Sequence, residues 1–229
     1  DDHITGSPGN DVLDGGPGLD VLLGGPGDDV LVADHLGDWN TEFAGEGYDT
    51  TRTALSSYRL WDNVEALEYA GPARPFEGSG NALDNRITGG AANDRLYGWD
   101  GNDTLLGLAG NDTLEGGNAN DTLDGGPGRD TLNGGQGDDL LRGGTGVDTF
   151  VFSAGAGDDT IADFDVASEV IDLRGLVVLA SDLSFSAADT DGDGSADDLL
   201  ISIDSQFGTA SIALHNVSVA EASSIDFLL

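Results

Sequence analysis

The sequence predicts an all-β protein: a right-handed parallel β-solenoid of nine-residue repeats, closed by a β cap at its C-terminal end. One observation is that residues 116–151 divide into four nonapeptides, GGNANDTLD, GGPGRDTLN, GGQGDDLLR and GGTGVDTFV. A second is that each opens with Gly-Gly, has Asp at position six and has Leu or Phe at position eight. A third is the period itself, which fits neither a helix nor a long strand. It indicates a turn of about six residues followed by a three-residue strand.

The first repeats occupy residues 1–32. Residues 1–5 read as positions five to nine of a repeat that lacks its first four, so we expect the chain to be the C-terminal piece of a longer protein. Full repeats begin at Gly6, Gly15 and Gly24. Each has Pro at position three, where a turn can use a fixed φ and does not need the N–H.

The nine-residue period lapses between residues 33 and 77. Residues 50–58 and 63–69 are predicted to be extended, and we expect wider rungs that continue the solenoid. Five aromatic residues lie here: Trp39, Phe43, Tyr58, Trp61 and Tyr69. They either fill the core or form a carbohydrate-binding platform, and the first interpretation is favoured.

The second block of repeats covers residues 78–151. An imperfect repeat over residues 80–88 has Asn85 where Asp is expected. Full repeats then begin at Gly89, Gly98, Gly107, Gly116, Gly125, Gly134 and Gly143. The second Gly is replaced by Trp99 and Leu108, and the Gly at position four by Ala92 and Ala119. We expect these turns to close, with weaker ion binding.

After a last offset turn at residues 155–159 the glycine period is gone. Alternation in residues 199–203 and 210–214 predicts a hairpin that turns at residues 205–208. With residues 177–183, it should cap the open end of the solenoid. The predicted parts are an N-terminal repeat block (1–44), calcium-poor spacer rungs (45–77), the main repeat block (78–164) and a C-terminal cap (165–229).

The composition is strongly acidic. Asp and Glu total 43 against 8 Arg and Lys, which gives a net charge of −35. This charge disfavours nucleic acid and anionic membranes as partners and favours bound cations. Cysteine is absent, so no disulfide can stabilise the fold, and no apolar run approaches the ~20 residues that span a bilayer. We expect no nucleic acid partner and no stable membrane insertion.

The fixed aspartates suit calcium, because a carboxylate is a hard oxygen ligand. Nine-residue half-turns place turns that are eighteen residues apart on the same edge. A Ca²⁺ between two such turns takes a carboxylate from each and fills its other positions with backbone carbonyls. The Asp pairs at this spacing are 2/20, 11/29, 94/112, 103/121, 112/130, 121/139 and 130/148. We expect about seven or more ions, one for each pair and any weaker sites.

The predicted ligands fall into three sets. The carboxylates are those of Asp2, Asp11, Asp20, Asp29, Asp94, Asp103, Asp112, Asp121, Asp130, Asp139, Asp148 and Asp159. The backbone carbonyls are those of Gly15, Gly18, Gly24, Gly27, Gly107, Gly110, Gly116, Gly125, Gly128, Gly134, Gly137, Gly143 and Gly146. The third set, Asp189, Asp191 and Asp193, opens a loop like an EF-hand but has Leu200 in place of the closing Glu. A bound ion and a solvated acidic turn both remain open for this loop.

Calcium should also drive folding. A three-residue strand buries too little apolar surface to offset the ordering of its own turn, so repeats are stable only when stacked. Without cations the turns crowd carboxylates together, and the Gly- and Asp-rich chain should be largely disordered.

No catalytic residues are predicted. His3, His35 and His215 are scattered and form no HExxH motif, and no GxSxG element is present. Carboxylates are too abundant for an Asp pair to indicate glycosidase chemistry.

The repeats closely resemble the RTX, or hemolysin-type calcium-binding, family. Residues 148–165 look like the end of the calcium-loaded β-roll in serralysin-type C-terminal domains, and Asp226-Phe227-Leu228-Leu229 is similar to their terminal secretion signal. The resemblance implies a calcium-binding C-terminal module that leaves the cell through a type I (ABC exporter) system and folds outside on meeting calcium. The serralysin zinc motif is missing, so protease activity is not implied. The alternative is a carbohydrate-binding accessory module for an alginate-like polysaccharide, and a third class places an activity upstream of this chain.

Overall fold

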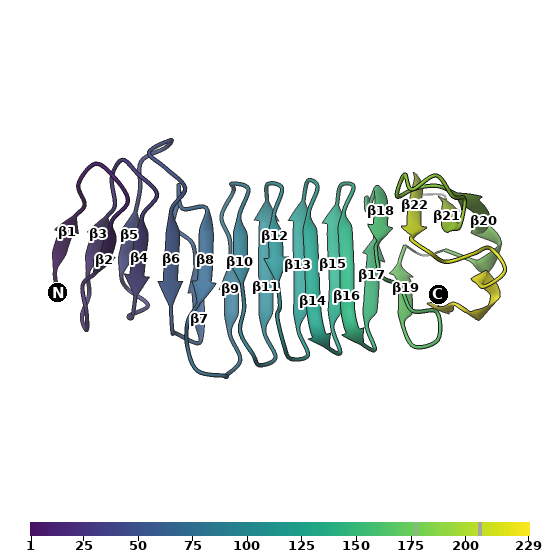
Figure 1. Cartoon of the computed structure of the whole chain (residues 1–229), viewed down its shortest axis with the longest axis horizontal. Coiled ribbons are helices and arrows are strands. Elements are labelled where there is room, and N and C mark those ends of the chain that lie inside the picture. The colour runs from purple at the N-terminus through teal and green to yellow at the C-terminus, as the bar shows by residue number, and fades with distance from the viewer. Residues whose placement is uncertain (177, 206–207) are drawn as a thin grey trace.

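The computed structural model describes residues 1–176, 178–205 and 208–229. They form an elongated parallel β-solenoid that begins at β1 and ends in a compact cap (Figure 1). The predicted fold class is confirmed. The helical segments among the described residues are the 3₁₀ turns η1 (Ala180–Asp182) and η2 (Ala222–Ser224), and no described helix is long and apolar enough to cross a membrane.

From β1 to β19 the strands alternate between two faces of the solenoid. Within this range, strands two positions apart along the chain pair in parallel, apart from β5 and β7. One face is a twelve-stranded sheet. In spatial order it contains β2 (Val12–Asp14), β4 (Val30–Ala33), β6 (Thr50–Thr53), β8 (Ala66–Tyr69), β10 (Arg86–Thr88), β12 (Thr104–Leu106), β14 (Thr122–Gly128), β16 (Leu140–Gly146), β18 (Asp158–Ile161), β22 (Gly208–Leu214), β21 (Asp198–Ser205) and β20 (Leu183–Ala188). This sheet runs without a break from the first block through the spacer into the cap.

The other face is divided into two sheets. The first contains β1 (His3–Thr5), β3 (Val21–Leu23) and β5 (Trp39–Thr41). The second contains β7 (Ser57–Arg59), β9 (Glu77–Ser79), β11 (Arg95–Asp100), β13 (Thr113–Asn118), β15 (Thr131–Gln136), β17 (Thr149–Ser153), β19 (Val170–Gly175) and β23 (Asp226–Leu228). The sheets separate between β5 and β7, so the spacer is where this face loses its hydrogen-bonded continuity.

The position-eight residues form the core, as predicted. The position-eight leucines of the main block stack in register and are each fully buried; they are Leu96, Leu105, Leu114, Leu123, Leu132 and Leu141. A smaller cluster of Leu13, Leu22 and Leu31 belongs to the first block. Asn40 and Thr51 occupy the rung between the two clusters, where the Asn40 amide donates to Leu31 O and to Thr51 Oγ1, both at 3.3 Å. A buried polar rung therefore divides the apolar core.

The spacer departs from the prediction in detail. Residues 50–58 are two strands, β6 and β7, with a turn between them, and not one strand. The favoured interpretation of the aromatic residues is right for Tyr58 and Tyr69, which are buried, and wrong for Trp39 and Phe43, which are exposed. Trp61 lies against Trp39, with ring centroids 5.6 Å apart.

The cap contains the predicted hairpin, now defined as the antiparallel pair β21 and β22. Gln206 and Phe207 of its predicted turn lie outside the described residues. The third strand of the cap is β20, at residues 183–188, and it follows η1. β22 also pairs with β18 and β23 with β19, so the cap extends both faces and closes the solenoid end.

The turns contain strained positions at three of the four sites in the main block where Gly is replaced, Ala92 being the exception. Trp99, Leu108 and Ala119 all have positive φ, between 73° and 84°. The equivalent of Ala119 on the next turn of the same edge is Gly137, with φ 125°. A non-Gly residue in the left-handed region costs roughly 1–2 kcal/mol.

Ala119→Gly should therefore raise the free energy of unfolding by about 0.5–1 kcal/mol, since the relief of strain exceeds the added flexibility of the unfolded chain. Gly137→Ala is the matched reverse change, and its Cβ would collide with the carbonyl oxygen of Ala119. This change should lower the free energy of unfolding by more than about 1 kcal/mol. Urea unfolding at saturating calcium measures both, and equal effects of one sign would contradict the assignment of strain.

Candidate calcium sites

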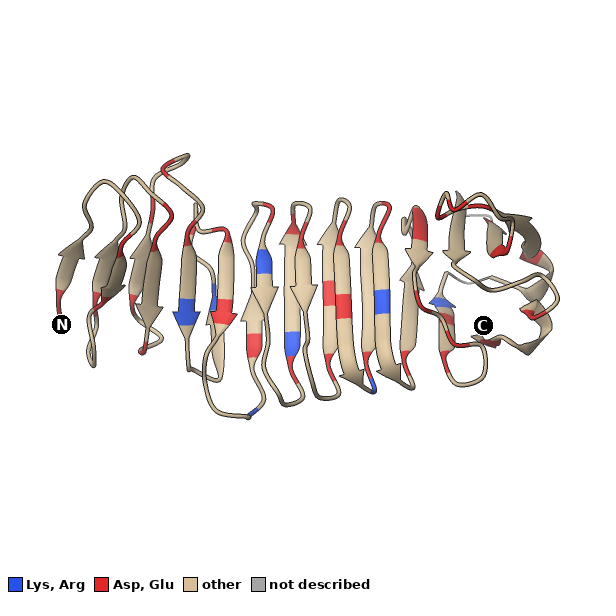
Figure 2. Ribbon diagram, viewed as in Figure 1, with Lys and Arg blue, Asp and Glu red and all other residues tan. Residues whose placement is uncertain are grey.

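The position-six aspartates lie at the turns, immediately before the strands, along both edges of the solenoid. Figure 2 shows acidic residues at these turns on either side of the sheets. Oδ1 of Asp121 accepts a hydrogen bond of 2.7 Å from the backbone N–H of Asp103. The N–H of Asp121 in turn donates to Oδ1 of Asp139 at 2.8 Å. The same bond joins every pair predicted at a spacing of eighteen: 2/20, 11/29, 94/112, 103/121, 112/130, 121/139 and 130/148.

The second carboxylate oxygen of most of these residues is buried and has no hydrogen-bond donor. Among the described residues this holds for Oδ2 of Asp20, Asp29, Asp103, Asp112, Asp121, Asp130, Asp139 and Asp148. A buried carboxylate oxygen without a donor costs more than the roughly 1–3 kcal/mol of a neutral group. A hard cation is the partner that such an oxygen lacks.

Glycine makes room for the space that these oxygens face. A Cβ on Gly107 would lie 2.5 Å from Oδ2 of Asp112 and 2.7 Å from the carbonyl oxygen of Gly125. One carboxylate and one carbonyl oxygen thus converge on the same point without an intervening donor. The residues present fit a calcium ion held between stacked turns, because its preferred ligands are carboxylate and carbonyl oxygens.

The predicted carbonyl ligands divide by position. The first-position oxygens that face such a cradle, beside an aspartate, are those of Gly24, Gly107, Gly116, Gly125 and Gly134. The position-four oxygens instead face the backbone of the stacked turn; these are Gly27, Gly110, Gly128 and Gly137. The carbonyl oxygens of Gly15, Gly18, Gly143 and Gly146 are not among the atoms nearest to a Cβ placed on any glycine of the stacked turns.

Four predicted aspartates differ from the rest. Asp2 is exposed, and Oδ2 of Asp11 accepts from Ser7 at the open end. Both oxygens of Asp94 accept backbone N–H groups, from Phe76 and Gly90. Asp159 Oδ1 accepts from Asp139, but its Oδ2 is not among the buried atoms without partners. Asp94 is therefore already satisfied by protein donors.

Asn85 marks a turn of a different kind. Its Oδ1 accepts the N–H of Asn81 at 2.7 Å. Its Nδ2 donates to Asn81 Oδ1 at 3.1 Å and, more weakly, to the carbonyl oxygens of Val64 and Glu65. An amide supplies the donor that a carboxylate lacks, so this turn closes on protein contacts alone.

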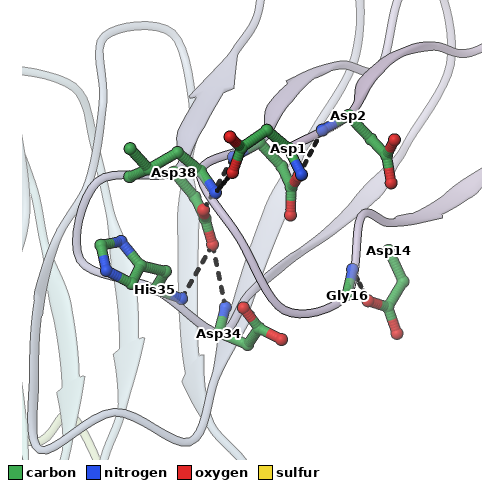
Figure 3. A network of polar contacts seen from close by, with 9 residues as sticks. Asp1, Asp2, Asp14, Gly16, Asp34, His35 and Asp38 are labelled. Carbon is green, nitrogen blue, oxygen red and sulfur yellow. Dashed lines mark hydrogen bonds and ion pairs between the residues drawn. The ribbon is translucent and has the colours of Figure 1, made fainter.

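Residues 33–49 extend both rows of acids, which the repeat pattern did not predict. Asp38 Oδ1 accepts the N–H of Asp20, and its Oδ2 accepts the N–H groups of Asp34 and His35. Figure 3 shows this network beside the N-terminal turns. Carboxylate oxygens of Asp20, Asp34 and Asp38 lie within 4.8 Å of one another. The available signal was spacing alone, because Asp38 follows Asp20 by eighteen residues.

In the cap, the acidic loop groups differently from the predicted set. Carboxylate oxygens of Asp189, Asp191 and Asp198 lie within 4.8 Å of one another, and Asp193 is not part of this group. Asp198 Oδ2 accepts hydrogen bonds from the backbone N–H and the hydroxyl of Thr190, both at 2.7 Å. The loop is therefore arranged around a carboxylate that already has protein donors.

Burial changes the acidity of the turn carboxylates. Removal from water raises the pKa of Asp121 to about 8 and those of Asp103 and Asp130 to about 7. The backbone N–H bonds and neighbouring carboxylates shift these values less than burial does. In the absence of cations, the fold thus holds these groups most easily in the protonated form.

Comparison with known sequences identifies the repeats. Residues 1–31, 79–114 and 115–150 match the profile of the RTX calcium-binding nonapeptide repeat, in four copies. These segments are RTX repeats. The chain is therefore an RTX calcium-binding repeat module, and the predicted resemblance is confirmed. No curated protein sequence matches the chain.

Solved structures include two similar proteins, both from Azotobacter vinelandii. The solution structure of the AlgE6R2 subunit of the mannuronan C5-epimerase is 23% identical, with a TM-score of 0.44, over 68% of this chain and 92% of that one. The AlgE6R3 subunit of the epimerase is 26% identical, with a TM-score of 0.35, over 63% of this chain and 75% of that one.

The raised pKa values predict how the calcium-free RTX module responds to pH. A carboxylate whose folded pKa lies above its unfolded value of ~3.8 contributes stability that is complete below about pH 4 and is lost as pH rises through the folded pKa. The loss begins above about pH 4 and is complete at the folded pKa values, which are about 6 for Asp112, about 7 for Asp103 and about 8 for Asp121. In calcium-free buffer, the β-sheet circular dichroism signal should therefore be stronger at about pH 5 than at about pH 8. A signal that stays constant or grows as pH rises would contradict the burial of these groups.

Proposed function

We propose that this RTX module folds when it meets calcium and that it is the C-terminal part of a secreted protein. The supporting observation is the row of buried Oδ2 atoms without donors. Calcium binding would supply the missing partner at each turn and would become folding free energy. Millimolar external calcium is sufficient for sites of this class.

Export follows from the same property. A chain that stays unfolded at low internal calcium can pass through a type I (ABC exporter) system and fold outside. Asp226–Leu228 becomes strand β23, paired with β19, so the backbone of the proposed terminal signal is free of this pairing only before folding. The polypeptide chain contributes no catalytic group in this proposal, and any activity lies in a preceding part.

The proposed order of parts stays that of the sequence: repeat block 1–44, spacer 45–77, main block 78–164 and cap 165–229. Two features support a division within the spacer. One face changes sheets between β5 and β7, and the polar rung of Asn40 and Thr51 separates the two apolar clusters.

Calcium titrations of two variants test the proposal. Wild-type protein should change from coil to β signal with millimolar Ca²⁺ and far less with Mg²⁺, which holds its waters. Asp121→Ala removes the unpartnered Oδ2 and the acceptor for the Asp103 N–H. Its calcium midpoint should rise, and the transition should become less steep, because each rung depends on its neighbours.

Asp124→Ala is the matched control, since Asp124 is partly exposed and its side chain makes no hydrogen bond among the described residues. Its midpoint should stay within about twofold of wild type, because surface changes are usually worth less than ±0.5 kcal/mol. Equal midpoints for the two variants, or wild-type protein that is fully folded in excess chelator, would refute the proposal.

Carbohydrate binding is a second candidate, favoured by an exposed aromatic depression on the eight-stranded sheet. Tyr97 and Trp99 lie with ring centroids 6.3 Å apart, and Trp99 is 55% exposed. They border a depression of about 410 Å³ that is also lined by Asn118, Asn133 and Gln136. Aromatic faces with nearby amides suit a sugar ring, and the net charge of −35 favours a neutral polymer over an anionic one.

Trp99→Gly tests this candidate cleanly, since Gly adopts the φ of 84° without strain. The variant should fold at wild-type calcium and lose binding to a neutral glucan or mannan in affinity electrophoresis. Ala119→Gly provides a control at another turn with positive φ. Wild-type protein that is not retarded by any tested polymer, or a Trp99→Gly variant that binds as well, rejects the candidate.

A further inference from the structure

The last full repeat of the first block meets a carboxylate that the nonapeptide pattern does not contain. Glu42 is buried, and its side chain contacts the neighbouring stacked turn, eighteen residues earlier, that begins with Gly24. Its Oε1 accepts the N–H of Gly24 at 2.7 Å, and its Oε2 accepts that of Gly25 at 3.0 Å. Within the main block the first Gly N–H can instead donate to a backbone carbonyl, as Gly107 does to Asp124 O. The last full repeat of that block resembles the Gly24 turn, because the N–H of Gly143 donates to Asp163 Oδ1 at 3.0 Å.

Glu42 also places a charged oxygen where the regular turns have a neutral one. A Cβ on Gly24 would collide with Oε1 of Glu42 and would lie 2.5 Å from Oδ2 of Asp29. At Gly107 the two corresponding atoms are the carbonyl oxygen of Gly125 and Oδ2 of Asp112. Glu42 and Gly125 both follow their glycine by eighteen residues. The Glu42 side chain thus occupies the place of a repeat carbonyl.

A third carboxylate completes the group. Asp49 precedes β6, and its Oδ1 accepts the N–H of Asp29 at 2.8 Å. Carboxylate oxygens of Asp29, Glu42 and Asp49 lie within 4.8 Å of one another, and all three residues are buried. Oδ2 of Asp29, a residue only 1% exposed, has no donor and faces the same cradle as Glu42. No Arg or Lys side chain is paired with this group among the described residues.

We propose that Asp29, Glu42 and Asp49 bind a calcium ion that closes the N-terminal repeat block, in a site that lies outside the nonapeptide pattern. The inference rests on the proposed calcium-binding function of the regular turns. Three buried carboxylates carry more negative charge than the two of a regular pair, and ligand charge tunes calcium affinity. This site therefore binds calcium more tightly than the regular sites and orders the polar rung of Asn40 and Thr51 early in folding.

The site also changes the meaning of the spacer. The nine-residue period lapses between residues 33 and 77, and calcium-poor rungs were predicted there, yet Glu42 and Asp49 of this region supply two of the three ligands. The ion would join the last turn of the first block to β6 of the continuous twelve-stranded sheet. The ion would thereby link the rungs that contain the small apolar cluster of Leu13, Leu22 and Leu31 to the rest of the solenoid.

The test uses the whole 229-residue chain with two isosteric variants, Glu42→Gln and Asp49→Asn. Asn at position 49 keeps the oxygen that accepts the Asp29 N–H and removes only the charge. Glu77→Gln is the control, because Glu77 is exposed on β9 and loses the same charge. Bound calcium is counted by native mass spectrometry at saturation, and tryptophan fluorescence follows the calcium titration near Trp39 and Trp61.

Each variant should bind one ion fewer than wild type and Glu77→Gln while keeping the folded circular dichroism signal. The fluorescence midpoint should rise about tenfold or more, since even outer-shell changes at metal sites cost 10–100-fold. If Glu42→Gln fails to fold because Gly25 loses its acceptor, the ion count of Asp49→Asn decides. An unchanged ion count in Asp49→Asn, with a midpoint equal to that of Glu77→Gln, overturns the inference. Wild-type protein that binds no calcium would instead overturn the proposed function of the whole module.

Discussion

One constraint governs this molecule: most regular turns bury a carboxylate with one oxygen satisfied and the other left without a donor. The Oδ1 atom of the aspartate receives a backbone N–H from the turn eighteen residues earlier, which fixes the stacking. The Oδ2 atom faces a glycine and a carbonyl oxygen and gains nothing from the protein. The turn of Asn85 has no such unpartnered oxygen. There an amide replaces the carboxylate, and its Oδ1 accepts from Asn81 while its Nδ2 donates to Asn81 Oδ1. We propose that the aspartates therefore make the stability of the solenoid depend on cations.

The remaining features follow from this dependence. The apolar core is narrow: each face contributes one column of leucines, from strands as short as three residues. Such a core cannot stabilise a single rung alone. Glycines at the turns leave the space that an ion needs, and positions without glycine, such as Trp99 and Leu108, are held at positive φ. The net charge of −35 opposes compaction until it is neutralised. In the proposed function, calcium would remove each of these weaknesses, so that folding would act as a calcium sensor.

The sequence predicts the repeats well because their order is local. A fixed Asp and a fixed Leu in each nonapeptide determine the alternate edges, the inward side chains and all seven aspartate pairs. It predicts the spacer poorly, because insertions there change the spacing and hide the register. Asp49 follows Asp29 by twenty residues and not eighteen, and Glu42 holds a glycine position. Nor does local pattern reveal that Asn40 and Thr51 share a buried rung, since that contact depends on strands eleven residues apart.

The most direct test is a crystal structure of the calcium-loaded chain with anomalous scattering that locates the ions. The calcium interpretation predicts an ion within about 2.3–2.6 Å of Oδ2 in Asp103, Asp112, Asp121, Asp130 and Asp139. The ions at Asp103, Asp112 and Asp121 should also contact the carbonyl oxygens of Gly116, Gly125 and Gly134. No ion should lie at the Asn85 amide. Turns that are folded with these oxygens ion-free, or bonded instead to protein donors, would contradict the central role of calcium.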